Sequence, residues 1–388
     1  MSAAKPKPLC SILSRCGGCS DQSEYAGQLA RKQQKIREAL SEVVAADRVG
    51  AVRGLSHPWG YRTKLLMPAL PGKRGQGPML GFYERGTTRM VDALGCPVQH
   101  PLTLAAAAMV RQVLANSPVI ATLPKGGKEG WLHGIGVRVD PSSGATELVL
   151  SGRTPKLPGG DPLARRLGEL PGISSVHVTA QERRTSYLLG DDFKLLAGRR
   201  RTVFHLLGEE FHLSPGSFFQ TSAEGAVLLG ELVREMAPAS IHNFADVYGG
   251  VGVFTRLLKD RWRRASISEI GAGAVADAKS WVKATEQTTV SVLAGRVEQT
   301  IGKVLARTPD FVLVDPPRSG CHPDVIRALG DDGPPTLLYV ACGLDALARD
   351  AAGLTRAGYA IDAVEAVDMF PHTPHVETVA RFVRPTVS

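Results

Sequence analysis

The chain has 388 residues, of which 43% are hydrophobic and 21% are charged. This balance is typical of a folded protein of two or three domains and excludes a disordered chain. The sequence contains no apolar stretch of about 18 residues or more, so we expect no membrane-spanning helix. The N-terminus lacks the apolar core of a signal peptide, and we therefore expect a cytoplasmic protein.

The formal net charge is +9, and the basic excess lies in residues 1–215, whereas residues 216–388 are slightly acidic. An electropositive half is typical of a surface that binds a polyanion such as nucleic acid. A solvated basic face without a partner is the alternative interpretation.

Three cysteines near the N-terminus, Cys10, Cys16 and Cys19, follow the pattern C-x5-C-x2-C, and Cys96 lies beside Pro97 in a distant turn. In a reducing compartment such cysteines are metal-binding or catalytic more often than disulfide-bonded. Four thiolates suit a [4Fe-4S] cluster or a tetrahedral zinc, and their spacing does not separate the two. Residues 21–45 follow with a helical apolar stripe, and we expect this helix to pack on the cysteine region.

Residues 51–215 contain short alternating runs that predict strands, with one clear helix over 104–115 and a glycine- and lysine-rich loop at 123–130. Basic strands of this kind could form an RNA-binding surface, although an ordinary β domain with a solvated face is the alternative. The candidate RNA-binding residues are Arg62, Lys64, Arg85, Arg89, Arg183 and Arg184.

After Gly216 the pattern changes to alternating strands and helices. A strand end and helix at 217–236 precede an apolar strand that ends at Asp246, and a turn rich in glycine follows it. Such turns let the backbone approach a bound nucleotide closely. Glu269 ends the next strand, where a carboxylate can accept hydrogen bonds from a ribose diol, and Asp315 follows another buried strand in a loop stiffened by proline.

A thiol and a carboxylate near the C-terminus form the candidate catalytic pair. Cys342 follows a buried-strand pattern at 337–340, where open α/β sheets place reactive groups, and Glu377 follows a loop with two prolines and two histidines. A thiol nucleophile with a carboxylate base would allow covalent catalysis. A buried structural cysteine and a solvated glutamate are the alternative.

These motifs together resemble the S-adenosylmethionine-dependent RNA 5-methyluridine methyltransferases, from Cys10 to Arg384. The resemblance rests on CGGC, YRTK, GFYERGTTRMVD with CPVQHP, SPGSFFQ, DVYGGVG, DPPRSG, YVAC and DMFPHTPHVETVA. It implies an α/β protein with three parts: an iron–sulfur region at 1–50, a β-rich central RNA-binding domain at 51–215 that supplies Cys96, and a Rossmann-like class I methyltransferase domain at 216–388.

The resemblance also implies the roles of the site residues. It makes Cys342 the nucleophile that adds to uracil C6 and Glu377 the base that removes the C5 proton. It implies that Cys10, Cys16, Cys19 and Cys96 bind a [4Fe-4S] cluster rather than zinc, and that Gln220, Tyr248, Glu269 and Asp315 surround S-adenosylmethionine. The chain departs from the family pattern at Gly343, where Asn is usual, at Gly249, where Cys is usual, at Thr221-Ser222, where Val-Asn is usual, and at Arg296, where an acidic residue is usual.

The resemblance implies RNA as the partner, with 23S ribosomal RNA as the expected substrate and tRNA as the second, and no obligate protein partner or membrane. The enzyme alternative is an RNA cytosine-C5 methyltransferase, which typically has a Pro-Cys or Thr-Cys nucleophile motif that this chain lacks. A non-catalytic RNA-binding relative is the alternative from a different class.

Overall fold

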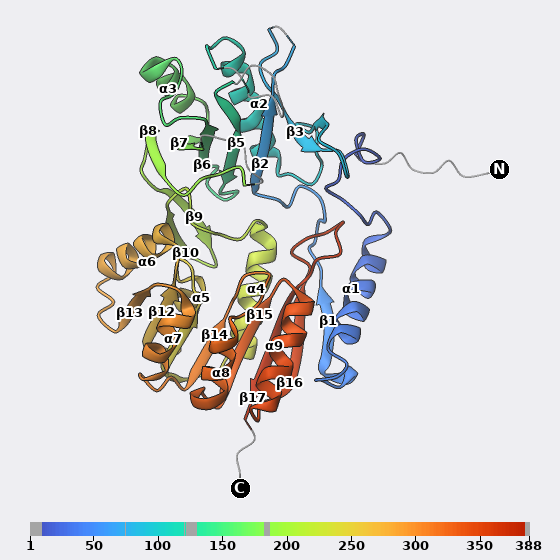
Figure 1. Cartoon of the computed structure of the whole chain (residues 1–388), viewed down its shortest axis with the longest axis vertical. Helices are drawn as coiled ribbons and strands as arrows, with labels where there is room; N and C mark the ends of the chain where they lie inside the picture. Colours follow the sequence, from blue (N-terminus) through green and yellow to red (C-terminus); the bar gives the residue numbers. More distant parts are fainter. Residues whose placement is uncertain (1–9, 74, 120, 122–129, 182–186, 385–388) are drawn as a thin grey trace, which may run out of the picture.

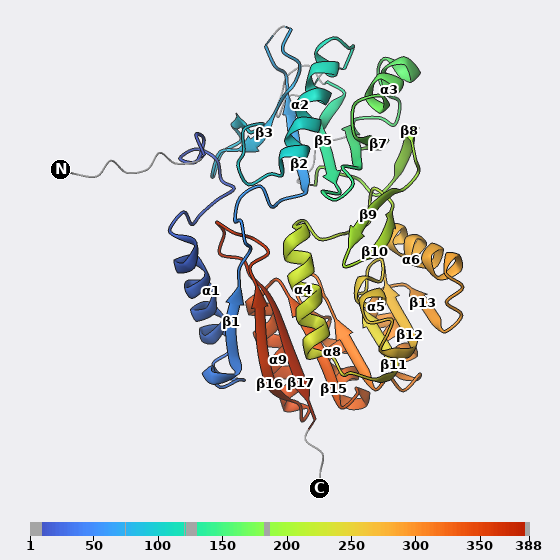
Figure 2. The ribbon, with the colours of Figure 1, turned by 180° about the vertical axis from the view of Figure 1, so that it is seen from behind.

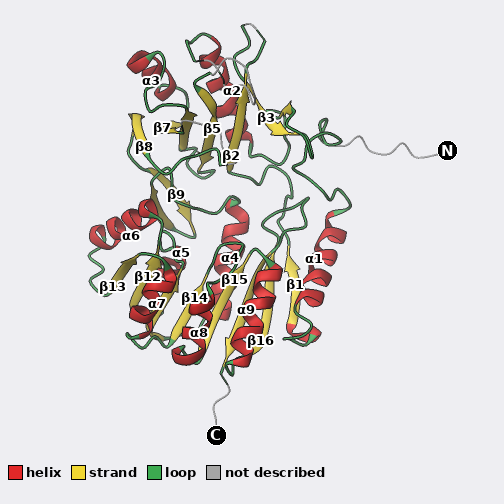
Figure 3. Cartoon of the chain, viewed as in Figure 1, coloured by secondary structure: helices red, strands yellow, loops and turns green. Residues whose placement is uncertain are grey.

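The computed structural model describes residues 10–73, 75–119, 121, 130–181 and 187–384. Two domains lie one above the other along the long axis of the molecule (Figure 1). The smaller one is built on strands β2 to β8, and the larger one holds most of the helices (Figure 3). No helix within the described residues is long and apolar enough to cross a membrane.

The larger domain is built on a sheet of eight strands within the described residues. Every neighbouring pair is parallel except those of β17, which runs antiparallel to both of its neighbours. In spatial order the strands are β1 (Val49–Arg53), β16 (Ala360–Val367), β17 (Glu377–Val383), β15 (Thr336–Ala341), β14 (Phe311–Val314), β11 (Ile241–Val247), β12 (Trp262–Glu269) and β13 (Val290–Ala294).

Helices cover both faces of this sheet, which explains why β14 and β15 are almost continuously apolar. One face packs against α1 (Tyr25–Ala39), α7 (Val297–Leu305), α8 (Pro323–Asp332) and α9 (Leu344–Arg356). The other face packs against α4 (Ala223–Met236), α5 (Val253–Leu257) and α6 (Ala272–Ala284), and Figure 2 shows α4 in front of the strands. The open α/β architecture expected for the C-terminal part is therefore present.

The central domain is a mainly antiparallel sheet of seven strands among the described residues. Their spatial order is β4 (Met90–Asp92), β3 (Met79–Tyr83), β2 (Lys64–Leu70), β5 (Leu132–Val139), β6 (Thr146–Gly152), β7 (Ile173–Ala180) and β8 (Phe193–Gly198). Helices α2 (Pro101–Ala115) and α3 (Gly160–Gly168) contribute to the apolar core on one face of this sheet. The opposite face includes Arg138, which donates hydrogen bonds to the carbonyl oxygens of Ser214 and Ser217.

Two segments pack differently from our expectation. Residues 49–53 form β1 at the edge of the large sheet, although 51–53 were assigned to the central domain. Helix α1 packs on the same sheet through Ile36, and its Arg31 pairs at 2.7 Å with Asp21, two residues after Cys19. The parallel pairing of β1 with β16 brings the two segments together across more than 300 residues of chain, which no local pattern indicates.

The hairpin of β9 (Thr202–Leu206) and β10 (Glu209–Leu213) also contacts the larger domain, although it falls within 51–215. Phe204 and Phe211 share an apolar cluster with Phe219, Val251 and Ala274. Residues 217–221, expected as a strand end, form a loop before α4. The predicted loop at 123–130, apart from Gly130, and the candidate residues Arg183 and Arg184 lie outside the described residues.

Candidate active site

Cys342 and Glu377 lie side by side at the carboxyl end of the large sheet. Cys342 directly follows β15, and Glu377 is the first residue of β17. These strands are antiparallel neighbours with Ala341 opposite Thr378, so the next pair in the register is Cys342 with Glu377. Cys342 is half-buried and Glu377 is 5% exposed. The sequence prediction that these two residues meet is consistent with this geometry.

The electrostatics of the pair depend on Arg318, which follows β14 in the neighbouring loop. Burial raises the pKa of the Cys342 thiol, and the Glu377 carboxylate raises it further. The charge of the Arg318 guanidinium and its hydrogen-bonding contact with the thiol lower that pKa. The pKa of Glu377 is raised well above its usual range by burial and by Asp315, and Arg318 opposes this rise too. Arg318 thus favours the charged form of both groups.

Sequence reasoning assigned no role to Arg318, although its position could have indicated one. The loop 315–318 follows β14, and β14 is the parallel neighbour of β15. Because the carboxyl ends of parallel strands meet at one edge of a sheet, a cation in this loop is placed near Cys342.

The structure also explains why glycine follows the nucleophile. A Cβ atom at Gly343 would lie 2.7 Å from the carbonyl oxygen of Arg318, closer than real Cβ atoms come to backbone oxygen. The missing side chain therefore lets the Arg318 loop approach the Cys342 turn. An asparagine at this position would require the loop to move.

Three of the four expected cofactor residues line one small cavity. Gln220, Tyr248 and Asp315 surround a space of about 40 Å³ together with Gly250 of the glycine turn. Tyr248 has a left-handed φ of 62°, a strained conformation that proteins keep mainly at ligand sites and turns. Burial and the carboxylates of nearby acidic residues raise the pKa of Asp315 to about 7. Asp315 therefore lies between this cavity and the Cys342 site.

The Glu269 carboxylate fixes the glycine turn through a hydrogen bond. Its Oε2 atom accepts a hydrogen bond from the amide of Gly250 at 3.0 Å, and its Oε1 atom accepts one from the amide of Gly271 at 2.5 Å. The carboxylate is thereby fixed between the turn and the start of α6. It lines a second, larger cavity that is contiguous with the glycine turn.

The four N-terminal and central-domain cysteines converge on one cavity of about 200 Å³. Cys10, Cys16, Cys19 and Cys96 all line it. Burial and the neighbouring thiols raise the pKa of Cys19 to about 11. Among the described residues no three His, Cys, Asp or Glu side chains are grouped closely enough for a single metal ion.

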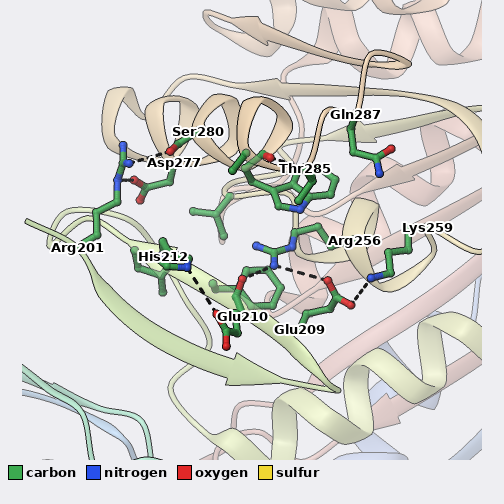
Figure 4. Close-up of a pocket in the computed structure, with 15 residues that line it drawn as sticks. Arg201, Glu209, Glu210, His212, Arg256, Lys259, Asp277, Ser280, Thr285 and Gln287 are labelled. Carbon is green, nitrogen blue, oxygen red and sulfur yellow. Dashed lines mark hydrogen bonds and ion pairs between the residues drawn. The ribbon is translucent and has the colours of Figure 1, made fainter.

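Another cavity, of about 380 Å³, lies between β10 and α6 and contains none of the expected site residues (Figure 4). Arg256 crosses it with its guanidinium 3.8 Å from the centre of the Phe211 ring and 5.2 Å from that of Trp281. The charge of Arg256 is matched by Glu209 at 3.6 Å, which also pairs with Lys259. The residues that line this cavity therefore belong to the contact between the hairpin and the larger domain.

Comparison with known proteins bears on the family and on the fold. The family model described as tRNA (uracil-5-)-methyltransferase matches residues 203–384. The match starts within β9, consistent with the packing of the hairpin on the larger domain.

Two curated relatives match almost the whole chain. An uncharacterised RNA methyltransferase of Halalkalibacterium halodurans is 30% identical over 386 residues, which cover 97% of this chain and 82% of the relative. One of Caldanaerobacter subterraneus is 31% identical over 385 residues, which cover 98% and 84%.

A solved structure is similar over both domains. It is the Pyrococcus abyssi tRNA (uracil-54, C5)-methyltransferase in complex with S-adenosyl-L-homocysteine, with a TM-score of 0.74 and 25% identity over 93% of this chain and 84% of that one. The large domain therefore has the α/β methyltransferase fold. The chain belongs to the RNA (uracil-5-)-methyltransferase family, whose members transfer a methyl group from S-adenosylmethionine to RNA.

Proposed function

We propose that this enzyme methylates C5 of one specific uridine in RNA through a covalent adduct between Cys342 and uracil C6. The observation that supports this most strongly is the register of β15 and β17, which sets the Cys342 thiol beside the Glu377 carboxylate. Arg318 and Asp315 lie at the same edge of the sheet, next to the cavity assigned to the cofactor.

The reaction needs a nucleophile in its first step, which is Cys342, and a base in its last step, which is Glu377. Uracil C5 is a weak nucleophile until the Cys342 thiolate adds to C6 and converts the ring to an enolate. S-adenosylmethionine, when bound, supplies the methyl group as a cationic sulfonium. Glu377 then accepts the C5 proton, and the bond between C6 and the Cys342 sulfur breaks to return the thiolate. Because the reactive form is the thiolate, Arg318 supports the first step by lowering the pKa of Cys342.

The experiment combines a deletion strain with purified protein. RNA from the deletion strain should lack one 5-methyluridine, and the purified enzyme should restore it in that RNA when S-adenosylmethionine is added. Methylation of cytosine instead of uracil would overturn the proposal.

We propose 23S ribosomal RNA as the substrate because the motif set with four cysteines resembles the ribosomal members of the family. The second candidate is tRNA, since the similar solved structure is a tRNA enzyme. The mapping experiment separates the two, because the missing 5-methyluridine is found in one RNA fraction or the other.

We further propose that Cys10, Cys16, Cys19 and Cys96 bind a [4Fe-4S] cluster. All four thiols line one cavity, and a cluster separates its ligands more widely than a single zinc ion because each thiolate binds a different iron. The cluster would connect the N-terminal segment to the turn that contains Cys96. Protein purified without oxygen should be brown with about four irons per chain, whereas stoichiometric zinc without iron would contradict the proposal.

A further inference from the structure

The largest cavity described above, of about 840 Å³, extends from the cofactor end of the large domain to the central sheet. Gly250, Glu269 and Gly271 line one side. Lys64 and His177 of the central sheet line the other. The family assignment explains the first wall, since it surrounds the glycine turn, but it gives no role to the second.

The strand register places a row of polar side chains on the second wall. Lys64 of β2 lies opposite Arg138 of β5, which lies opposite Glu147 of β6, and this lies opposite Ser175 of β7. Directly opposed residues point to the same face of a sheet, and so does His177, two residues after Ser175. The helices α2 and α3 cover the other face, so this row faces the large domain.

Within this row the charges of Arg138 and Glu147 are already satisfied. Arg138 pairs with Glu147 at 2.9 Å, and both side chains are at most 4% exposed. Arg138 also donates hydrogen bonds to the carbonyl oxygens of Ser214 and Ser217, in the loop that leads to Phe218. The buried pair thus connects the two domains, and Glu147 attracts Lys64 by its charge without forming an ion pair with it.

Lys64 is the charge that remains. Its ammonium group has no hydrogen-bond or ion-pair partner among the residues that the structure describes, and it lines the cavity. Burial, reinforced by the charge of Arg138, lowers the pKa of Lys64 to about 8. An unpaired and partly buried ammonium is costly, and such groups are concentrated at binding and catalytic sites.

Two further groups lie on the same wall as Lys64. His177 is 2% exposed, both of its ring nitrogens are shielded from solvent, and its imidazole faces the backbone of Arg200. Arg200 is exposed and lines the same cavity, just before β9. It makes no ion pair within the described part of the chain. Arg201 differs from it, because Asp277 binds it at 2.7 Å. Asp191, which is exposed, is an acidic residue that also lines this cavity.

We propose that this wall is a subsite for one phosphate group of the RNA strand, bound by Lys64 together with Arg200. The inference rests on the proposed function and deepens it, because it says which part of the RNA enters beside the cofactor. A phosphate supplies several acceptor oxygens, enough for the ammonium and a guanidinium at once. Binding restores the solvation that Lys64 loses on folding.

The test compares Lys64→Met with Lys194→Met. Lys194 is an exposed residue of β8 that points away from the cavity, because its neighbours Phe193 and Leu195 line it. The probe is a polyuridylate oligonucleotide whose Kd is measured over a range of salt concentrations, and the Kd of S-adenosyl-L-homocysteine is measured in parallel. Lys64→Arg checks that any effect comes from the charge.

Lys64→Met should weaken RNA binding and reduce the slope of log Kd against log salt by about 0.7, the value for one contact with single-stranded nucleic acid. Lys64→Arg should keep the wild-type slope, Lys194→Met should keep it too, and S-adenosyl-L-homocysteine should bind all variants equally. Equal slopes for Lys64→Met and wild type would overturn the proposal. Loss of S-adenosyl-L-homocysteine affinity in Lys64→Met would assign the wall to the cofactor and overturn it as well.

These binding measurements do not depend on methyl transfer. If wild-type enzyme bound RNA with the expected slope yet formed no 5-methyluridine, the proposed function would fail while the phosphate subsite stood.

Discussion

The backbone amide of Ser20 donates a hydrogen bond of 2.9 Å to the carbonyl oxygen of His372, and the amide of Asp21 donates to the same oxygen at 3.1 Å. Ser20 directly follows Cys19, and His372 belongs to the loop that leads to Glu377. The cysteine segment and the loop before the base are therefore connected through the main chain. The proposed cluster on the cysteines would stabilise this connection.

Trp59 is the side chain that completes this connection. Its ring stacks on His372 with centroids 3.7 Å apart, and it also lines the cysteine cavity. Trp59→Ala should lower kcat by about tenfold to a hundredfold, because a small displacement of the base has a large effect on rate. Trp59→Phe retains a stacked ring and should recover most of the activity. A raised KM for RNA with unchanged kcat would show instead that Trp59 contacts the substrate.

Arg318 should determine the pH at which the enzyme becomes active. Because its guanidinium lowers the pKa values of Cys342 and Glu377, Arg318→Met should raise both. The thiolate and the ionised carboxylate are the working forms, so the rise of kcat/KM with pH should move to higher pH. Arg318→Lys keeps the charge and should shift the profile less. A uniform loss at every pH, with the profile in place, would contradict this role.

Gly343 should not tolerate a side chain, since a Cβ atom there would meet the carbonyl oxygen of Arg318 at 2.7 Å. We expect Gly343→Ala to fold and to lose activity, because the Arg318 loop must move away from Cys342. Gly302→Ala is the matched control: its Cβ would meet nothing within 4 Å, and it lies within α7. This control should be as active as wild type and slightly more stable, by about 0.5–1 kcal/mol. Full activity in Gly343→Ala would mean that the loop position is unimportant.

The ion pair between Lys32 and Asp368 should make a large contribution to stability. The two groups lie 2.6 Å apart, with side chains 4% and 0% exposed, and they attach α1 to the start of the loop before Glu377. Lys32→Met leaves a buried carboxylate unpaired and should reduce the free energy of unfolding by about 3–5 kcal/mol. The exposed pair Arg53–Glu235 provides the comparison, since Arg53→Met should cost about 1 kcal/mol or less. Equal midpoints of urea unfolding for the two variants would contradict this difference.

Much of the catalytic domain could be predicted because its signals are local. The apolar runs at 311–314 and 337–340 are buried strands, and the glycine turn after Val247 lines a cavity. The order of strand, turn and helix fixes which residues reach the carboxyl edge of the sheet. For that reason the sequence alone predicts that Cys342, Asp315 and Glu269 lie at this edge.

The remaining features depend on contacts between distant segments. Residues 49–53 contain nothing that distinguishes the edge strand of a large sheet from a strand of the central domain, since their partner is β16. The apolar stripe of α1 predicts a buried face but not which domain it packs on. The proposed role of Arg318 follows from the pairing of β14 with β15. The proposed role of Lys64 follows from its position opposite Arg138.

The most direct test of the central claim is a denaturing gel of the enzyme after incubation with RNA and S-adenosylmethionine. Glu377→Gln should show an RNA-shifted protein band, because without the base the C5 proton stays and the bond from Cys342 to C6 persists. Cys342→Ala should show no shifted band and no 5-methyluridine. A shifted band in Cys342→Ala would mean that another thiol, such as the buried Cys321, is the nucleophile, and would contradict the account.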